Sequence, residues 1–331
     1  MKKENDDIYD PSYSDMLRVA FTSEFRRGKL QDLVALLSGR NFDTKQYEDV
    51  IIQDSFTRMK SAVMRFMNET NFKRFLMIIR SAGFVDASMI GSQNALNVAY
   101  ILYLTLRDQK VRAEDIERLV RRWFVMSVLT GRYSGSPEST IDYDIRQIDA
   151  QGIESYSDSL IRGELSEAFW NAGLPQSMDT SASSSPYFRV FQAAQIRLND
   201  KGFLSRDITV RELVEVKSDV HHIFPREYLK KHGMTRGQYN QIANYVVAQS
   251  EINIAIGKKD PATYFQQVLD QCNGGKKRYG NIVDADELHE NFRMNCIPDG
   301  LEQIDFEGYR TFLDQRRKLM AQKIKRYFEA L

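Results

Sequence analysis

The sequence predicts a mainly α-helical fold with a small α+β element near residue 220. Apolar residues recur at three- and four-residue spacing through most of the first 205 residues, which is the period of an amphipathic helix. Beyond residue 205, short runs of β-branched and aromatic residues alternate with short helical segments. With 331 residues, 42% of them hydrophobic and 27% charged, the chain is long enough for two ordinary cores, and we expect two domains.

The first domain, residues 1–185, is expected to be a multi-helix domain. Its clearest apolar stripe starts near Ala113 and includes Trp123, and such a stripe is typical of a helix that faces a core. No GxxxxGK[ST] or GxGxxG motif occurs, so the sequence offers no phosphate-binding loop. The other stripes, punctuated by glycines near their ends, cover Leu30 to Leu37, Phe56 to Phe66, Phe72 to Ile79 and Leu96 to Leu106.

A polar segment of small residues separates the two predicted domains. Ser177 to Ser185 is followed by Pro186, which favours an exposed loop or hinge, so the second domain is expected to cover residues 186–331. A helix is predicted from Tyr187 to Asn199. Leu213, Val214 and Val216 then indicate a short strand within Arg211 to Lys217.

Two adjacent histidines, His221 and His222, come next in the segment from Asp219 to Pro225 and make up half of the four histidines in the chain. Successive side chains of a strand point to opposite faces, so at least one of the two rings must face solvent, a ligand or a cleft. Adjacent histidines alone are more often structural than catalytic. Their interpretation therefore depends on the residues C-terminal to them.

The segment after the histidines predicts two short helices, a strand and a further helix. The helices are Arg226 to His232 and a second one ending near Ile242, separated by a turn at Gly233. Asn244 to Gln249 is rich in β-branched and aromatic residues and predicts a strand. A helix that carries Asn253 is expected to begin near Ser250.

This order of elements resembles the ββα-metal finger of HNH (His-Me finger) nucleases. More narrowly, the stretches HHIFP, YNQIANY, EINIAIG and DPATY between Asp219 and Tyr264 resemble the nuclease domain of GmrSD-type, modification-dependent (type IV) restriction endonucleases. The segments Glu69 to Phe75 and Arg121 to Tyr133 resemble the middle helical region of that family. The resemblance implies that residues 186–331 form an HNH-like nuclease domain with C-terminal helices.

The resemblance also implies the roles of individual residues. Hydrolysis of a phosphodiester needs a base and a cation, and His222 is the expected base, with its second ring nitrogen held by a backbone carbonyl or a side-chain amide. His221 and Asn253 are expected to bind one divalent ion, with Asp219 as a reserve ligand. Magnesium suits a hydrated, oxygen-rich site, but the softer imidazole leaves manganese, nickel or zinc open. Asn244 is expected to orient the catalytic site.

The implied function is a metal-dependent DNA endonuclease that acts on foreign or modified DNA in bacterial defence. Full-length members of the family open with a ParB-like, nucleotide-dependent domain, whose motifs do not occur in Met1 to Asn41. This difference leaves two interpretations, a missing N-terminal domain or a separate nucleotide-dependent subunit. The alternative function is a non-catalytic DNA-binding or regulatory subunit that partners a separate nucleotide-hydrolysing protein.

The net charge of +1 does not by itself indicate a nucleic-acid-binding protein, so phosphate contacts must come from local basic faces. Candidates beside the predicted active-site helix are Lys258 with Lys259 and the run from Lys276 to Arg278. A C-terminal basic helix is a further candidate. Its cations are Arg316, Arg317, Lys318, Lys323, Lys325 and Arg326.

The remaining features favour a cytoplasmic protein without a membrane segment. The sequence begins without the apolar core of a signal peptide, and the longest apolar stretch, Ala95 to Leu106, is too short to span a bilayer. Cys272 and Cys296 are the two cysteines of the chain and form no metal-binding or disulfide pattern. We therefore expect both thiols to be free.

Overall fold

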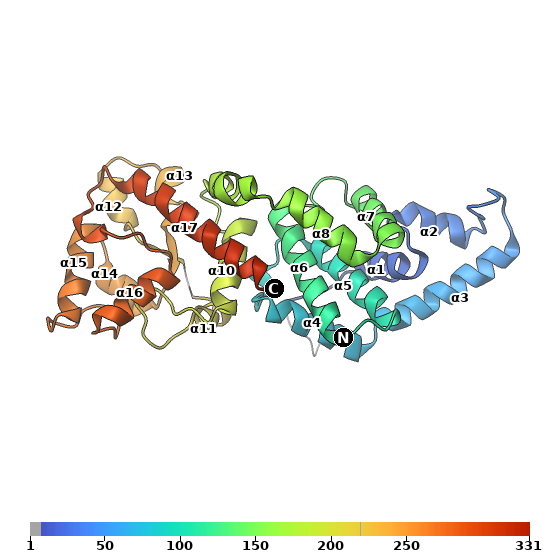
Figure 1. The fold of residues 1–331 in the computed structure, drawn as a ribbon, viewed down its shortest axis with the longest axis horizontal. Coiled ribbons are helices and arrows are strands. Elements are labelled where there is room, and N and C mark those ends of the chain that lie inside the picture. The colour runs from blue at the N-terminus through green and yellow to red at the C-terminus, as the bar shows by residue number, and fades with distance from the viewer. Residues whose placement is uncertain (1–7, 219) are drawn as a thin grey trace. The chain divides into compact units, whose positions relative to one another are not determined.

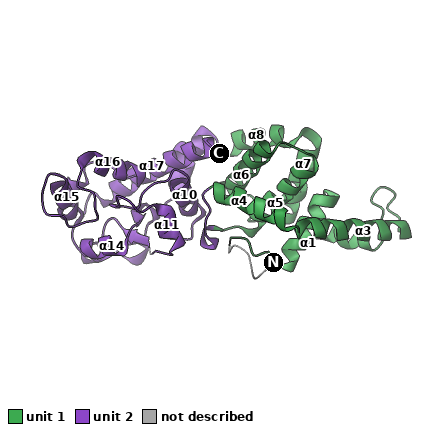
Figure 2. Cartoon of the chain, turned by 90° about the horizontal axis from the view of Figure 1, so that it is seen from below, with its two compact units in different colours: residues 1–82, 90–165, 331 green, residues 83–89, 166–330 purple. Residues whose placement is uncertain are grey.

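The computed structural model describes residues 8–218 and 220–331. As predicted, these residues are mainly helical, with one small two-stranded sheet among them. They form two compact units, shown in Figure 2. The first contains the described residues up to 82, residues 90–165 and residue 331, and the second contains residues 83–89 and 166–330.

The first unit consists of eight α-helices in its described part, and the predicted apolar stripes fall on five of them. In α5 every side chain from Ala95 to Leu106 is buried, so this helix is apolar on all sides because it is surrounded by others. Ser92 caps its first turn. The eight helices (Figure 1) are α1 Tyr13–Phe25, α2 Leu30–Leu37, α3 Asp49–Phe66, α4 Glu69–Ser81, α5 Gln93–Asp108, α6 Ala113–Thr130, α7 Pro137–Gln151 and α8 Ile153–Glu164.

The second unit surrounds the small sheet with short helices and one long one. The helical elements that precede the sheet are η1 Ala87–Met89, η2 Phe169–Gly173, α9 Leu174–Ser177, α10 Pro186–Arg197 and α11 Val210–Glu215. The sheet and the elements between and after its strands are β1 Val220–His222, α12 Arg226–Lys231, α13 Arg236–Tyr239, η3 Ile242–Asn244, β2 Tyr245–Val247, α14 Ser250–Ile256, α15 Pro261–Cys272, α16 Ala285–Met294, η4 Leu301–Gln303 and α17 Tyr309–Glu329.

The domain boundary predicted between residues 185 and 186 falls within the second unit. Both η2 and α9 pack against α17, and the ring of Trp170 lies 5.9 Å from that of Phe328. The polar stretch after α9 does form a largely exposed loop, as predicted. Even so, the backbone N–H of Ile242 donates to the carbonyl of Thr180, which ties this loop to the segment before β2.

The strand predicted within Arg211 to Lys217 is wrong, because this segment forms helix α11. The Thr209 hydroxyl accepts from the backbone N–H of Glu212, whose carboxylate in turn accepts from the Thr209 backbone N–H. This capping box stabilises the first turn of a helix, and Val210 and Leu213 are then buried on one side. The β-branched composition of the segment is outweighed by this local cap.

The two strands are antiparallel, and their register places the histidines. His221 pairs with Val246 and His222 pairs with Tyr245. Paired residues of an antiparallel ladder share a face, so the two histidine side chains leave the sheet on opposite sides. The second predicted strand is shorter than expected, since Asn244 closes the 3₁₀ turn η3 before β2 begins.

Three of the six cations expected to contact phosphate from α17 are buried, namely Arg316, Arg317 and Lys323. Arg316 is fully buried and donates to the carbonyl oxygens of Ala243, Tyr245 and Asn295 at 2.7, 2.7 and 3.1 Å. The expectation of phosphate contact is wrong for this residue because its charge stabilises the backbone on both sides of η3 and β2.

Two more cations of α17 are buried in ion pairs. Arg317 is bound by Asp314 and Asp179, and Lys323 pairs with the buried Asp200. Phosphate contact is therefore a wrong expectation for these side chains as well. Lys318 and Arg326 remain exposed.

No helix in the described part of the chain is long and apolar enough to cross a membrane. Cys272 and Cys296 are free thiols, as predicted.

Candidate active site

The candidate site is built on β1, which carries both histidines side by side. His221 is buried, with 8% of its surface exposed, whereas His222 is half-buried. A strand of only three residues holds them, so their positions depend on the bonds that β1 makes with its neighbours. Asp219, the reserve metal ligand, lies outside the described residues.

The imidazole of His222 is held by the side chain of Asn240. The Nε2 atom lies 2.9 Å from Oδ1 of Asn240. A carbonyl oxygen only accepts, so Nε2 carries the proton and the lone pair of the neutral ring is on Nδ1. The Tyr245 ring stands edge-to-face with the imidazole at 5.1 Å. The side-chain amide partner predicted for His222 is therefore Asn240.

Burial lowers the pKa of His222 below the ordinary value for histidine. The hydrogen bond with Asn240 opposes this effect, and the positive charge of Arg226 and the neighbouring His221 reinforce it. The ring is consequently neutral at neutral pH. A neutral imidazole with one fixed N–H and one open lone pair can accept a proton from a water molecule.

Asn240 was missed by the sequence analysis, although it lies within the stretch YNQIANY. It follows helix α13, whose first turn is fixed by a capping box between Thr235 and Gln238, and its backbone N–H closes that helix on the carbonyl of Arg236. An asparagine after a short helix is typical of a cap. Its contact with a ring 18 residues earlier in the chain depends on tertiary structure.

The side chain of Asn244 is hydrogen-bonded to the backbone of two neighbouring segments. Its side chain is fully buried, and its Oδ1 accepts from the backbone N–H of Phe224 at 2.8 Å. Its Nδ2 donates to the carbonyls of Phe224 and Tyr239 at 3.1 and 3.2 Å. These bonds tie the end of β1 to the segment that carries Asn240. Asn244 thus positions the elements that hold His222 and does not bond the imidazole itself.

Asn253 lies on α14, the helix that follows β2, and is half-buried. Its backbone N–H donates to the carbonyl of Gln249, and its carbonyl accepts from Gly257. Among the described residues no hydrogen bond joins its side chain to His221, His222 or Asn244. The helix predicted to carry this residue is confirmed, whereas its role as a metal ligand stays a prediction.

The donor set predicted for a metal ion is small. Within residues 8–218 and 220–331, no three His, Cys, Asp or Glu side chains gather where they could hold an ion. His221 and Asn253 would supply one imidazole nitrogen and one amide oxygen. Such a pair does not fit a closed, four-ligand zinc site, but it fits a hydrated ion that completes its shell with water and phosphate oxygens.

Exposed cations lie in the loops around this part of the second unit. Lys276, Lys277 and Arg278 are exposed in the loop after α15, and Lys258 is exposed after α14. Lys259 is used differently, since its ammonium donates to the carbonyls of the last turn of α14. Four of the five predicted phosphate-contacting cations in these loops are therefore open to solvent.

Comparison with known proteins adds little to this geometry. No family model and no solved structure matches the chain. An uncharacterized protein of Methanocaldococcus jannaschii is 25% identical to it over 217 residues, which cover 62% of this chain. The chain spans only 36% of the length of this relative. The name of the relative states no activity.

Proposed function

We propose that this protein is a metal-dependent DNA endonuclease in which His222 is the general base. The observation that carries the proposal is the hydrogen bond between His222 Nε2 and Asn240 Oδ1, which leaves a neutral, oriented imidazole with an open Nδ1. The resemblance of the surrounding stretches to HNH nucleases supplies the reaction and the substrate. Foreign or modified DNA is the proposed biological target.

In the proposed reaction, Nδ1 of His222 takes a proton from a water molecule, and the water oxygen attacks a phosphorus of the DNA backbone. Nε2 keeps its own proton because Asn240 holds it, so the ring becomes a doubly protonated cation. The hydrogen bond to Asn240 stabilises that cation. The bond from phosphorus to the leaving oxygen then breaks, and the DNA strand is cut.

His221 and Asn253 are the residues proposed to hold a divalent ion in this reaction. The ion would offset the negative charge that develops on the phosphate and the leaving oxygen. His221 and His222 therefore have separate tasks in this proposal. Loss of His221 should raise the metal concentration needed for cleavage, and loss of His222 should lower turnover with metal binding retained.

The proposed function is tested with the purified full chain and supercoiled plasmid DNA, with Mg²⁺, Mn²⁺, Ni²⁺ and Zn²⁺ supplied separately. We expect nicked or linear DNA with at least one ion and intact plasmid after chelation with EDTA. DNA binding without cleavage under every ion, with modified as well as unmodified plasmid, would contradict the proposal and favour the non-catalytic alternative.

A further inference from the structure

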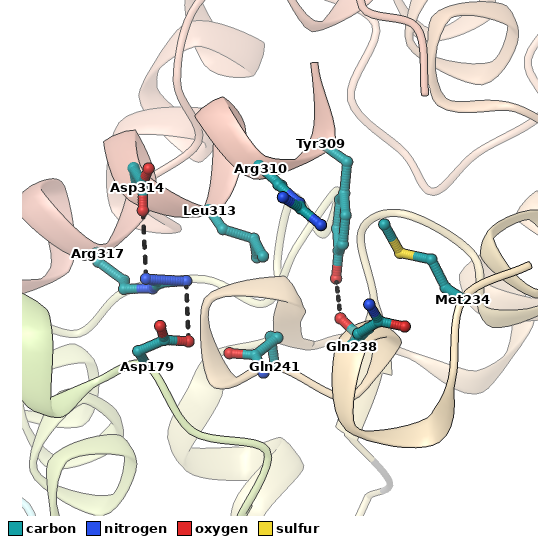
Figure 3. Close-up of a pocket in the computed structure, with 9 residues that line it drawn as sticks. All are labelled: Asp179, Met234, Gln238, Gln241, Tyr309, Arg310, Leu313, Asp314 and Arg317. Carbon is teal, nitrogen blue, oxygen red and sulfur yellow. Dashed lines mark hydrogen bonds and ion pairs between the residues drawn. The ribbon is translucent and has the colours of Figure 1, made fainter. Parts of the chain in front are cut away.

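A cavity of about 230 Å³ lies between the first turns of α17 and the segment that carries Asn240 (Figure 3). Its polar lining comes from both sides. Arg310 and Arg317 belong to α17, while Gln238 and Gln241 belong to the segment around α13 and η3. The volume suits a small ring system and is below the size of a typical drug pocket.

Two polar atoms of this lining are buried without a hydrogen-bond partner among the described residues. They are Oε1 of Gln241, an acceptor, and Nε of Arg317, a donor. A buried polar group without a partner costs free energy, so a site that keeps both an acceptor and a donor is suited to a ligand that bonds to them. Figure 3 shows the Gln241 side chain between those of Asp179 and Gln238.

The other polar atoms of these side chains are already bonded, which fixes their orientation. Gln241 Nε2 donates to the carbonyl of Gly237 at 2.8 Å, and Oε1 is left to face the cavity. Arg317 Nη1 and Nη2 lie 3.2 Å from the carboxylates of Asp314 and Asp179. The unpaired acceptor and the unpaired donor are therefore held in place by these bonds.

The rest of the lining provides surface for a flat ring and one guanidinium, that of Arg310, beside the carboxylates of Asp179 and Asp314 that Arg317 pairs. Met234 and Leu313 provide apolar surface. The hydroxyl of Tyr309 donates to the carbonyl of Gln238 at 3.1 Å, so Tyr309 presents mainly its ring to the cavity. Arg310 is exposed at the cavity and forms no ion pair with any residue in the described part of the chain. Its guanidinium is suited to a phosphate.

We propose that this cavity binds the base of a nucleotide, with Gln241 Oε1 accepting from a base N–H, Arg317 Nε donating to a base nitrogen or carbonyl oxygen, and Arg310 contacting the phosphate. All four DNA bases present a donor beside an acceptor on their pairing edge. That edge is open only in an unpaired base, so the ligand is either a free nucleotide or a base of single-stranded or locally opened DNA.

The position of the cavity connects base binding to the proposed reaction. Gln241 directly follows Asn240, which holds His222, and the Tyr309 hydroxyl bonds the backbone two residues before Asn240. A base in the cavity would thus contact the segment that orients the general base. If the bound base belongs to DNA, the inference rests on the proposed function. The cavity would then recognise a base near the cleavage position.

The test begins with titration of the full chain with dAMP, dCMP, dGMP and dTMP, followed by calorimetry. Gln241→Leu removes the open acceptor and Arg310→Ala removes the phosphate contact, and we expect each to weaken binding about tenfold or more. Gln266→Leu is the matched control, since Gln266 is an exposed glutamine of α15 outside the cavity. Absence of nucleotide binding, or equal affinities for the wild-type protein and both cavity variants, would overturn the proposal.

A competition experiment distinguishes the two sources of the base. A labelled mononucleotide is first bound to the protein. Two competitors are then added in separate experiments, a single-stranded oligonucleotide and the same oligonucleotide with abasic sugars. Displacement by the first alone supports a base of DNA as the ligand. Displacement by free nucleotides but by neither oligonucleotide supports the base site and overturns its connection with DNA.

Failure of this inference is distinguishable from failure of the proposed function. Plasmid cleavage that is lost in His222→Ala but unchanged in rate and sequence preference in Gln241→Leu overturns the connection of the base site with DNA and leaves the nuclease in place. Nucleotide binding that depends on Gln241, in a protein that cuts no DNA, supports the base site and removes the nuclease.

Discussion

Oδ1 of Asn240 lies 2.9 Å from Nε2 of His222 and determines which ring nitrogen carries the proton. The two residues come from different elements, a three-residue strand and the turn after α13, and Asn244 ties these elements together through the backbone of Phe224 and Tyr239. The base proposed for catalysis is therefore oriented by Asn240, a residue to which the sequence alone assigned no role.

Asn240→Ala should lower turnover by about tenfold to a hundredfold, because the imidazole loses the group that fixes its tautomer and direction. DNA affinity should stay unchanged, which a role in overall folding would not predict. Steady-state cleavage and fluorescence anisotropy measure the two quantities. Asn240→Asp keeps an acceptor oxygen and should restore turnover, and the control Asn281→Ala changes an exposed asparagine in a loop. A parallel loss of binding and turnover would contradict the positioning role.

Arg316→Met should destabilise the protein by about 3 kcal/mol or more, because it leaves the buried carbonyls of Ala243, Tyr245 and Asn295 without their donor. Burial already lowers the pKa of Arg316 to about 10, which reflects how completely its charge is removed from water. Urea denaturation followed by circular dichroism measures the loss. The exposed Arg326→Met should change the unfolding free energy by less than about 0.5 kcal/mol. Equal effects of the two substitutions would contradict the structural role of Arg316.

Glu24→Gln should destabilise the protein at neutral pH and lose this effect in acid. Burial alone would raise the pKa of Glu24, but hydrogen bonds from Arg58 and Arg65 outweigh it, and the net shift is downward. The pKa is then lower in the folded than in the unfolded chain, so the stabilisation is complete above the unfolded value of 4.5 and is lost as the pH falls through the folded value.

The thermal midpoints of Glu24→Gln and wild type should therefore differ at pH about 7 by the equivalent of about 1 kcal/mol and converge as the pH falls below the folded pKa of Glu24. Glu114→Gln, on an exposed glutamate of α6, is the control and should be neutral throughout. A constant difference at every pH would show that the carboxylate charge is not responsible.

Replacement of Lys276, Lys277 and Arg278 by alanine should weaken DNA binding. The slope of the logarithm of the binding constant against the logarithm of the salt concentration should become shallower by about 0.9 for each phosphate contact that is lost. These cations are exposed in the loop after α15, unlike the buried cations of α17. A control with the same change of charge replaces the exposed Lys45, Lys60 and Lys110 of the first unit. An equal loss of affinity in the control would mean that only net charge matters.

The sequence predicted the helices well because helical periodicity is a local property. The stripes around Trp123 and from Leu96 to Leu106 lie within α6 and α5. The strand predicted around Val214 was wrong because a capping box at Thr209 and Glu212 decided the local structure, a competition that β-propensity alone does not describe.

Parts of the site could not be predicted because they depend on contacts between distant residues. The sequence predicts two adjacent histidines in an extended segment, but Asn240, the partner of His222, follows a turn that the sequence does not place near β1. The sequence around Arg316 is typical of an exposed basic face of a helix. The guanidinium nevertheless donates to the carbonyls of Ala243 and Tyr245. Whether a cation faces solvent or the backbone of another segment is decided by packing.

The substitution His222→Ala tests most directly whether His222 activates water. Cleavage of supercoiled plasmid and binding to the same DNA are measured side by side for wild type and variant, with the metal ion that supports the highest activity. We expect the cleavage rate to fall by about 10²- to 10⁴-fold while DNA and metal affinities are retained. A variant that cuts as fast as wild type would contradict the role of His222 as the base.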